Sequence, residues 1–181
     1  MADTATSFGI GDTVPSFSLT DTEGTRHDVP AEHPPAATVL IQTCNHCPYV
    51  VAWNPRLRAV AEEYGPRGVR FLAISSNDPE RYPADSPERM AQFVRDHDWP
   101  IPYAFDESQD VARALGSERT PELFVLDSEH RLAYHGAPDS DHGDPDQNAA
   151  WLRAALDAVM AGAAPEQAET PPRGCSVKWR S

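Results

Sequence analysis

The sequence has no long apolar run and almost no lysine. None of its 181 residues lies in a stretch of about 18 apolar positions, and residues 1–13 carry neither a basic start nor an apolar segment. We therefore expect a soluble, cytoplasmic protein without a membrane-spanning helix. Lys178 is the single lysine beside fourteen arginines, and the formal net charge is −13. This balance argues against nucleic-acid binding, which needs clustered basic residues.

The sequence also has only three cysteines, Cys44, Cys47 and Cys175. Three thiols cannot build a disulfide scaffold, and the reducing cytoplasm disfavours one. The chemistry of these cysteines is therefore expected to be transient. Cys44 and Cys47 are two residues apart, a spacing that lets their sulfurs close a small disulfide ring.

The Cys-x-x-Cys pair lies at a strand-to-helix junction. It follows the apolar run 39–41 and precedes a segment with helical spacing. A helix N-terminus offers unpaired N–H groups and positive potential, which favour a thiolate. His46 lies between the two cysteines, and its imidazolium would stabilise the thiolate further. Both influences stabilise the reduced form and so act on the redox potential more than on the rate.

Metal binding is the main alternative for these residues. A closed zinc site needs four ligands, and His46 is poorly placed to bind together with both neighbouring cysteines. The aspartates of the loop before the last helix lack the ligand spacing of a calcium-binding loop, so a solvated, helix-capping loop is favoured; they are Asp139, Asp141, Asp144 and Asp146. We expect no metal and no cofactor.

Hydrophobic periodicity predicts strands that alternate with helices. The predicted strands are 14–20, 25–29, 38–42, 69–74, 103–105, 123–126 and 131–134, and the predicted helices are 48–64, 86–97, 109–115 and 147–161. The first helix is expected to kink or restart at Asn54, before Pro55. The pattern predicts an α/β fold with a central mixed sheet, helices on both faces and an N-terminal β-hairpin. We expect a flexible segment 1–12, a domain 13–162 and an extended tail 163–181.

The order of these elements, the Cys-x-x-Cys pair and the segment 119–127 together resemble the thioredoxin superfamily. Within it, the chain is similar to the redoxins of the alkyl hydroperoxide reductase/thiol-specific antioxidant (AhpC/TSA) type, whose N-terminal hairpin resembles residues 11–19. Residues 44–50 and 174–179 resemble a peroxiredoxin-like subgroup with a Cys-Asn-His-Cys motif. The resemblance implies a thioredoxin-like fold over nearly the whole chain.

The resemblance also implies roles for individual residues. Thr120 and Pro121 would form a cis peptide bond that faces the cysteines and contacts the substrate. Cys44 would be the exposed attacking thiolate, and Cys47 would resolve the mixed disulfide. In the competing assignment, Cys47 reacts with a peroxide and Cys44 resolves it.

The chain departs from better-known relatives at several positions. Aligned on Cys47, the Thr or Ser and the Pro of a peroxiredoxin pocket are replaced by Cys44 and Leu40. Arg119 lies about two residues before the position of the activating arginine. The strand before the cysteines offers Thr38 and Gln42, with no acidic residue. Proton transfer from Cys47 would then need His46 or water, unless His46 is only a solvated residue at the helix start.

Cys175 has two interpretations. It is either a third redox thiol that the tail returns to the site, or a small buried residue that pins the tail down. The sequence as a whole predicts a thiol-disulfide oxidoreductase that cycles Cys44 and Cys47, in antioxidant defence or redox homeostasis. Its partners would be protein or small-molecule thiols and disulfides. The alternatives are a thiol peroxidase that uses Cys47 on peroxides, and a non-catalytic redox-sensing or metal-binding module.

Overall fold

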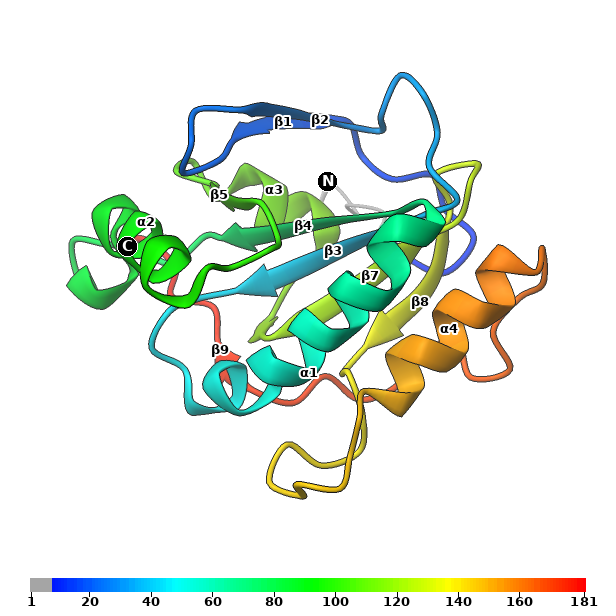
Figure 1. Cartoon of the computed structure of the whole chain (residues 1–181). Helices are drawn as coiled ribbons and strands as arrows, with labels where there is room; N and C mark the ends of the chain where they lie inside the picture. The colour runs from blue at the N-terminus through cyan, green and yellow to red at the C-terminus, as the bar shows by residue number, and fades with distance from the viewer. Residues whose placement is uncertain (1–7) are drawn as a thin grey trace, which may run out of the picture.

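The computed structural model of the chain describes residues 8–181, and its centre is a five-stranded mixed sheet (Figure 1). The strand order is β5-β4-β3-β7-β8, with β3, β4 and β5 parallel and β7 and β8 antiparallel to their neighbours. The strands are β1 (Phe17–Thr20), β2 (Arg26–Val29), β3 (Ala37–Thr43), β4 (Val69–Ser75), β5 (Tyr103–Phe105), β6 (Arg119–Thr120), β7 (Glu122–Leu126), β8 (Leu132–Gly136) and β9 (Cys175–Ser176). The helices are α1 (Pro48–Tyr64), α2 (Pro87–His97), α3 (Asp110–Leu115) and α4 (Ala150–Met160), with 3-10 turns η1 (Gly65–Arg67) and η2 (Pro83–Asp85). The predicted α/β architecture is confirmed, including the β1-β2 hairpin.

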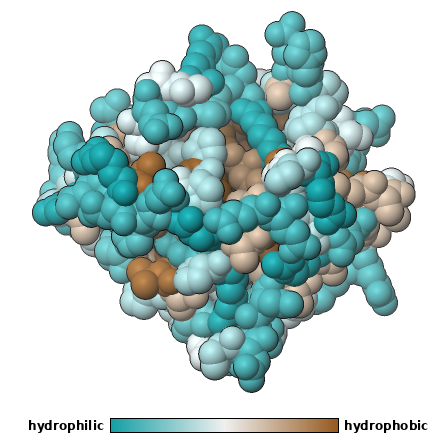
Figure 2. Space-filling model, in the orientation of Figure 1, coloured by the Kyte–Doolittle hydropathy of each residue, from teal (hydrophilic) through white to brown (hydrophobic). Residues whose placement is uncertain are grey.

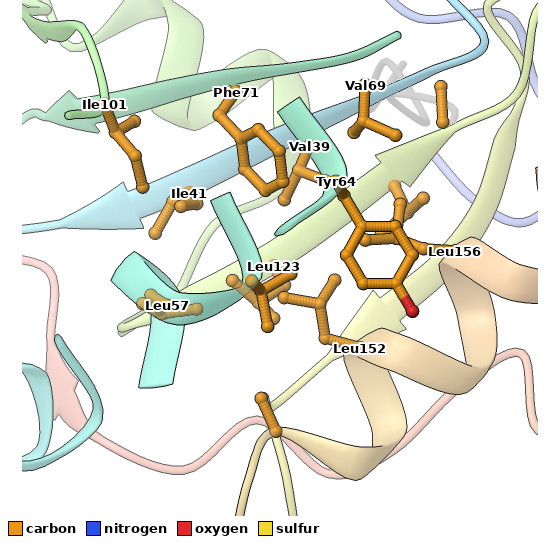
Figure 3. Close-up of a cluster of buried hydrophobic side chains, with 14 of the residues drawn as sticks. Val39, Ile41, Leu57, Tyr64, Val69, Phe71, Ile101, Leu123, Leu152 and Leu156 are labelled. Atoms are coloured by element: carbon orange, nitrogen blue, oxygen red, sulfur yellow. The ribbon is translucent and has the colours of Figure 1, made fainter. Parts of the chain in front are cut away.

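All seven residues of the central strand β3 are buried, as expected for a strand that is covered on both faces. Val39 and Ile41 point to one face, where they pack with residues of α1 and α4 (Figure 3). Leu40 points to the other face, where α3 and the β1-β2 hairpin cover the sheet. Each fully buried Leu or Ile side chain contributes about 1.5–3 kcal/mol. The two cores therefore hold the sheet, and with it the end of β3, firmly in place.

The helix after the cysteines differs from its prediction. α1 is continuous through Pro55, so the expected restart at Asn54 is absent. Proline lacks the N–H that would bond to the carbonyl four residues earlier, which is that of Val51. Val51 is 59% exposed, so water can reach this turn. The helix tolerates the missing bond at this exposed position.

Both ends of the chain return to the sheet. Residues 1–7 of the predicted flexible segment lie outside the described residues, but Gly11 and Asp12 exchange backbone hydrogen bonds with Leu132 at 2.8 and 2.9 Å. The tail after α4 runs back past the start of α1 (Figure 1). Its strand β9 pairs with β6, far from the end of α4. The boundaries at 13 and 162 stay predictions.

The face of the molecule shown in Figure 2 is mostly hydrophilic, with small separate hydrophobic patches. Among the described residues, Ile10 and Val51 are the large hydrophobic residues that are exposed. No helix in residues 8–181 combines the length and apolar character that crossing a membrane requires.

Candidate redox site

The Cys-x-x-Cys segment connects β3 to α1 at the carboxyl ends of the parallel strands. Cys44 directly follows β3, and Cys47 is the residue that caps the N-terminus of α1. This is the edge at which open α/β sheets place their ligand sites. The strand-to-helix junction predicted from the sequence is confirmed.

The structure brings all three sulfurs together. The Sγ atoms of Cys47 and Cys175 lie 2.8 Å apart. Cys44 and Cys47 belong to one buried cluster, and the partly buried Cys175 packs against this cluster. Thr120 lies over the pair, with its hydroxyl oxygen 3.5 Å from the Cys44 sulfur and its carbonyl oxygen 3.2 Å from the Cys47 sulfur. The bond between Thr120 and Pro121 is cis, as the resemblance implied. Cys175 is therefore part of the site.

The two cysteines differ in acidity. A hydrogen bond from the Cys44 thiol lowers the pKa of Cys47, and further hydrogen bonds from Cys175 and the backbone N–H of Val50 lower it more. The pKa of Cys44 is raised, because its proton is held by Cys47, because it is buried and because the Asp85 carboxylate is near. The negative charge is thus expected on Cys47, with Cys44 as its protonated partner.

The expected exposure of Cys44 is wrong. Cys44 is 3% exposed and Cys47 is fully buried. Cys44 and Cys47 form a buried cluster with Val50, against which Tyr49 and the returning Cys175 pack, and the hydroxyl oxygen of Thr120 lies 3.5 Å from the Cys44 sulfur. The sequence could not show the contributions of Thr120 and Cys175, because both come from segments more than 70 residues away.

Asp85 is a site residue that the sequence reasoning missed. Its fully buried carboxylate accepts hydrogen bonds from the backbone N–H of Asn45 at 2.7 Å and from the amide of Asn77 at 2.8 Å. It also pairs with Nδ1 of His46 at 2.6 Å. Asp85 lies on the connection that follows β4, whose carboxyl end shares an edge with that of β3. The predicted order of the strands, which brings the ends of β3 and β4 together, is the only feature of the sequence that could have indicated Asp85.

His46 lies between the buried cysteines and solvent. Its side chain is 35% exposed and lines a cavity of about 460 Å³ between η2 and α2. Ligand atoms of Cys44, His46 and Asp85 lie within 4.8 Å of one another, and these are residue types that bind zinc. However, His46 Nδ1 and the Asp85 carboxylate already pair with each other at 2.6 Å, and the raised pKa of Cys44 disfavours the thiolate that a metal would need. The arrangement suits proton transfer better than metal binding.

A second buried acid, Glu122, lies on β7 directly opposite Gln42 of β3. Its carboxylate accepts hydrogen bonds from the backbone N–H groups of Glu118 and Arg119 and pairs with His135 at 2.6 Å. These bonds fix the turn that carries Thr120. The strand before the cysteines, β3, has no acidic residue, but the neighbouring strand β7 supplies Glu122. This side chain holds the turn that carries Thr120 in place.

The acidic loop before α4 has a structural role. Asp139 is fully buried and accepts hydrogen bonds from Trp53 and Arg56 at 2.8 and 2.9 Å. It also accepts the backbone N–H of Ala149, just before α4, at 2.9 Å. Asp139 thus fixes the residue before α4 but does not cap the first turn of the helix, and its predicted solvation is wrong.

Comparisons with known proteins agree with this geometry. An uncharacterized conserved protein from Geobacillus kaustophilus is 36% identical, with a TM-score of 0.90 over 97% of this chain and 94% of the other. A hypothetical protein from Sinorhizobium meliloti 1021 is 34% identical, with a TM-score of 0.90 over 97% of both chains. Peroxidoxin BcpB from Mycobacterium tuberculosis shares the fold at 22% identity, with a TM-score of 0.63 over 81% of this chain and 97% of the other.

A search among curated proteins found no match. The sequence pattern of the AhpC/TSA family, in contrast, matches residues 10–135, which include both cysteines of the Cys-x-x-Cys pair and the cis-proline turn. The structural neighbours are thioredoxin-fold proteins, and the family is one of redox proteins that act through thiols. The chain therefore belongs to the AhpC/TSA family.

Proposed function

We propose that the protein is a thiol-disulfide oxidoreductase that cycles Cys44 and Cys47 between dithiol and disulfide. The observation that carries the proposal is the packing of the two cysteines in one buried cluster at the start of α1, where the hydroxyl oxygen of Thr120 lies 3.5 Å from the Cys44 sulfur and its carbonyl oxygen 3.2 Å from the Cys47 sulfur. The lowered pKa of Cys47 and the raised pKa of Cys44 favour one thiolate beside one thiol. A thiolate that touches a protonated thiol is ready both to attack a disulfide and to be resolved.

The net reaction passes two electrons from the dithiol to an external disulfide. The Cys47 sulfur ends in a bond to the Cys44 sulfur, the external S–S bond breaks, and two thiols leave. The proton of Cys44 must be removed before its sulfur can attack. The His46 imidazole lies within 4.8 Å of that sulfur and is held by Asp85. We assign proton transfer to His46 and its positioning to Asp85.

The partners are expected to be protein or small-molecule thiols and disulfides, and the role is expected in redox homeostasis. A substrate-binding role for Thr120 and Pro121 stays a prediction, since the backbone of Thr120 is already paired with the tail. A cytoplasmic location also stays a prediction.

Peptide mapping combined with a turnover assay tests the proposal. After mild oxidation with diamide, mass spectrometry is expected to find a peptide pair linked through Cys44 and Cys47. The protein should also reduce hydroxyethyl disulfide at the expense of glutathione. Cys47→Ser should abolish this activity. Equal activity in the wild type and Cys47→Ser, or oxidation that never links Cys44 to Cys47, would contradict the proposal, and stoichiometric metal in the purified protein would favour a metal-binding module.

A thiol peroxidase is the second candidate, because the thiolate expected at Cys47 is the species that attacks peroxides. Cys47 would take one peroxide oxygen to form a sulfenic acid, and Cys44 would displace water to form the disulfide. Peroxide-dependent consumption of a thiol reductant, lost in Cys47→Ser, would support this activity. Turnover with disulfides but not with hydrogen peroxide would exclude it.

A further inference from the structure

The short strand β6 beside the cysteines is paired with the chain's own tail in a separate two-stranded sheet. β9 pairs antiparallel with β6, so that Cys175 lies opposite Thr120 and Ser176 opposite Arg119. The edge of such a strand can pair with an extended peptide from another protein. Here the tail already forms that strand, and it places a cysteine sulfur 2.8 Å from the sulfur of Cys47.

The pairing depends on a glycine and on backbone anchors. A Cβ atom on Gly174 would lie 2.0 Å from the carbonyl oxygen of Thr120, so only glycine permits this approach. After Cys175, the backbone of Lys178 exchanges hydrogen bonds with Asn77 and Asp78 at 2.8 and 2.9 Å. The tail is thus fixed on both sides of the sulfur.

The three cysteines differ in how easily an external thiol or disulfide can reach them. Cys44 and Cys47 are buried, at 3% and 0% exposure, whereas Cys175 is only partly buried. A pocket of about 370 Å³ opens beside Gly174, lined also by Tyr49, Arg119 and Arg173. Cys175 is therefore the most solvent-exposed of the three cysteines.

We propose that Cys175 is the thiol through which the buried Cys44–Cys47 couple exchanges electrons with external thiols and disulfides. The proposal rests on the proposed function. When the couple is oxidised, the Cys175 thiolate attacks the Cys47 sulfur. The bond between Cys47 and Cys175 forms, the bond between Cys44 and Cys47 breaks, and Cys44 leaves as a thiolate that takes up a proton. This exchange needs no further oxidant, because the number of disulfides is unchanged.

An external thiolate then attacks the Cys175 sulfur of the new disulfide. A mixed disulfide with Cys175 forms, and Cys47 leaves as the thiolate that its surroundings stabilise, which makes it a good leaving group. A second external thiolate attacks the outer sulfur of the mixed disulfide and frees Cys175. The external thiols are oxidised to their disulfide, and the protein regains three thiols. Run in reverse, the same steps reduce an external disulfide.

The charges around Cys175 suit this role. Burial and the hydrogen bond with Cys47 raise the pKa of Cys175, while Lys178 and Arg119 oppose the rise. Once Cys47 is held in a disulfide with Cys44, its contribution is gone and the cationic neighbours remain. Burial still raises the pKa of Cys175, but its thiolate forms more easily in the oxidised state, in which it must attack, than in the reduced state.

Disulfide mapping in Cys44→Ser is the first test. With Cys47 and Cys175 as its only thiols, the monomer should lose two hydrogens on treatment with diamide and yield a peptide pair linked through these two residues. The variant Gly174→Ala in the same background should form this link far more slowly, because the tail cannot dock. Gly65→Ala is the matched control, since a Cβ there meets nothing within 4 Å.

The second test measures the reduction of the oxidised protein by glutathione. Cys175→Ser should still form the Cys44–Cys47 disulfide, but glutathione should reduce it roughly tenfold more slowly or worse than in the wild type. Ser176→Ala, a change on the same strand, should react as the wild type does. Circular dichroism checks that each variant is folded.

The outcomes separate this inference from the proposed function. A Cys175→Ser variant that is reduced as fast as the wild type, or a Cys44→Ser variant that forms no internal disulfide, overturns the role of Cys175 and leaves the couple intact. A wild type that never forms the Cys44–Cys47 disulfide overturns the proposed function itself.

Discussion

At the scale of single residues, the site is governed by how one negative charge is shared among neighbouring sulfurs. The neighbouring thiols of Cys44 and Cys175 lower the pKa of Cys47, whereas the contact with Cys47, burial and the Asp85 carboxylate raise the pKa of Cys44. The spacing of the cysteines indicated a redox pair. It could not indicate which sulfur is charged, because the deciding groups, Asp85 and Cys175, come from distant segments.

The first prediction concerns the charge on Cys47. An ordinary cysteine ionises near pH 8.5, so a lowered pKa keeps the Cys47 thiolate at pH 6. Ultraviolet absorbance of the thiolate at about 240 nm should persist at that pH in the reduced wild type and vanish in Cys47→Ser. Because the pKa of Cys47 is lower in the folded than in the unfolded state, the free energy of unfolding should increase as the pH rises toward the ordinary cysteine pKa. It should decrease again as the pH falls through the lowered pKa. Ordinary titration of all three thiols would contradict the assignment.

The second prediction concerns Asp85. In Asp85→Asn the hydrogen-bond acceptor for Asn45 is kept, but the negative charge near Cys44 is removed. The pKa of Cys44 should therefore fall, and turnover should show a changed pH profile because His46 has lost its ionic partner. Peptide-resolved alkylation across a pH series measures the first effect, and the disulfide reductase assay measures the second.

Asp96→Asn is the matched control for this variant, because Asp96 lies on α2 at the rim of the same cavity. If Asp85→Asn and Asp96→Asn show the same pH profile as the wild type, Asp85 has no positioning role.

At the scale of elements, the sequence predicted the strands and helices well where hydrophobic runs are continuous. β3, β4 and β7 were placed to within a residue or two, because fully buried strands appear as unbroken apolar runs. The restart at Asn54 was wrong, since α1 tolerates Pro55 at an exposed turn. The pairing of β6 with β9 could not be predicted, because two-residue strands carry no periodicity.

The acidic loop gives a prediction at this scale. Asp139→Asn removes a buried charge that pairs with Arg56 and accepts the backbone N–H of Ala149, just before α4. Breaking a buried ion pair by removing one partner typically costs about 3–5 kcal/mol, and the amide should retain part of the hydrogen bonding, so we expect a loss of about 2–4 kcal/mol in the free energy of unfolding. Urea denaturation measures this loss.

Asp146→Asn, in the exposed part of the same loop, should change stability by no more than about 0.5 kcal/mol. Equal effects of the two substitutions would show that Asp139 acts only through the general charge of the loop.

At the scale of the whole molecule, the fold turns a short motif into a three-thiol site. The α/β pattern was enough to predict the family's architecture and the location of the Cys-x-x-Cys pair at the end of a central strand. It left the role of Cys175 open, because the course of the tail depends on backbone pairing and on a close approach at Gly174. In the structure the sulfur of Cys175 lies 2.8 Å from that of Cys47, which supports the proposal that Cys175 is a third redox thiol.

The reduction potential of the Cys44–Cys47 couple tests the central claim most directly. Equilibration with glutathione buffers, followed by mapping of the disulfide, should show a reversible two-electron couple. Since stabilising the Cys47 thiolate stabilises the reduced form, the potential should be less negative than the roughly −270 mV of thioredoxin. The absence of a reversible couple, or a potential more negative than that value, would contradict the account.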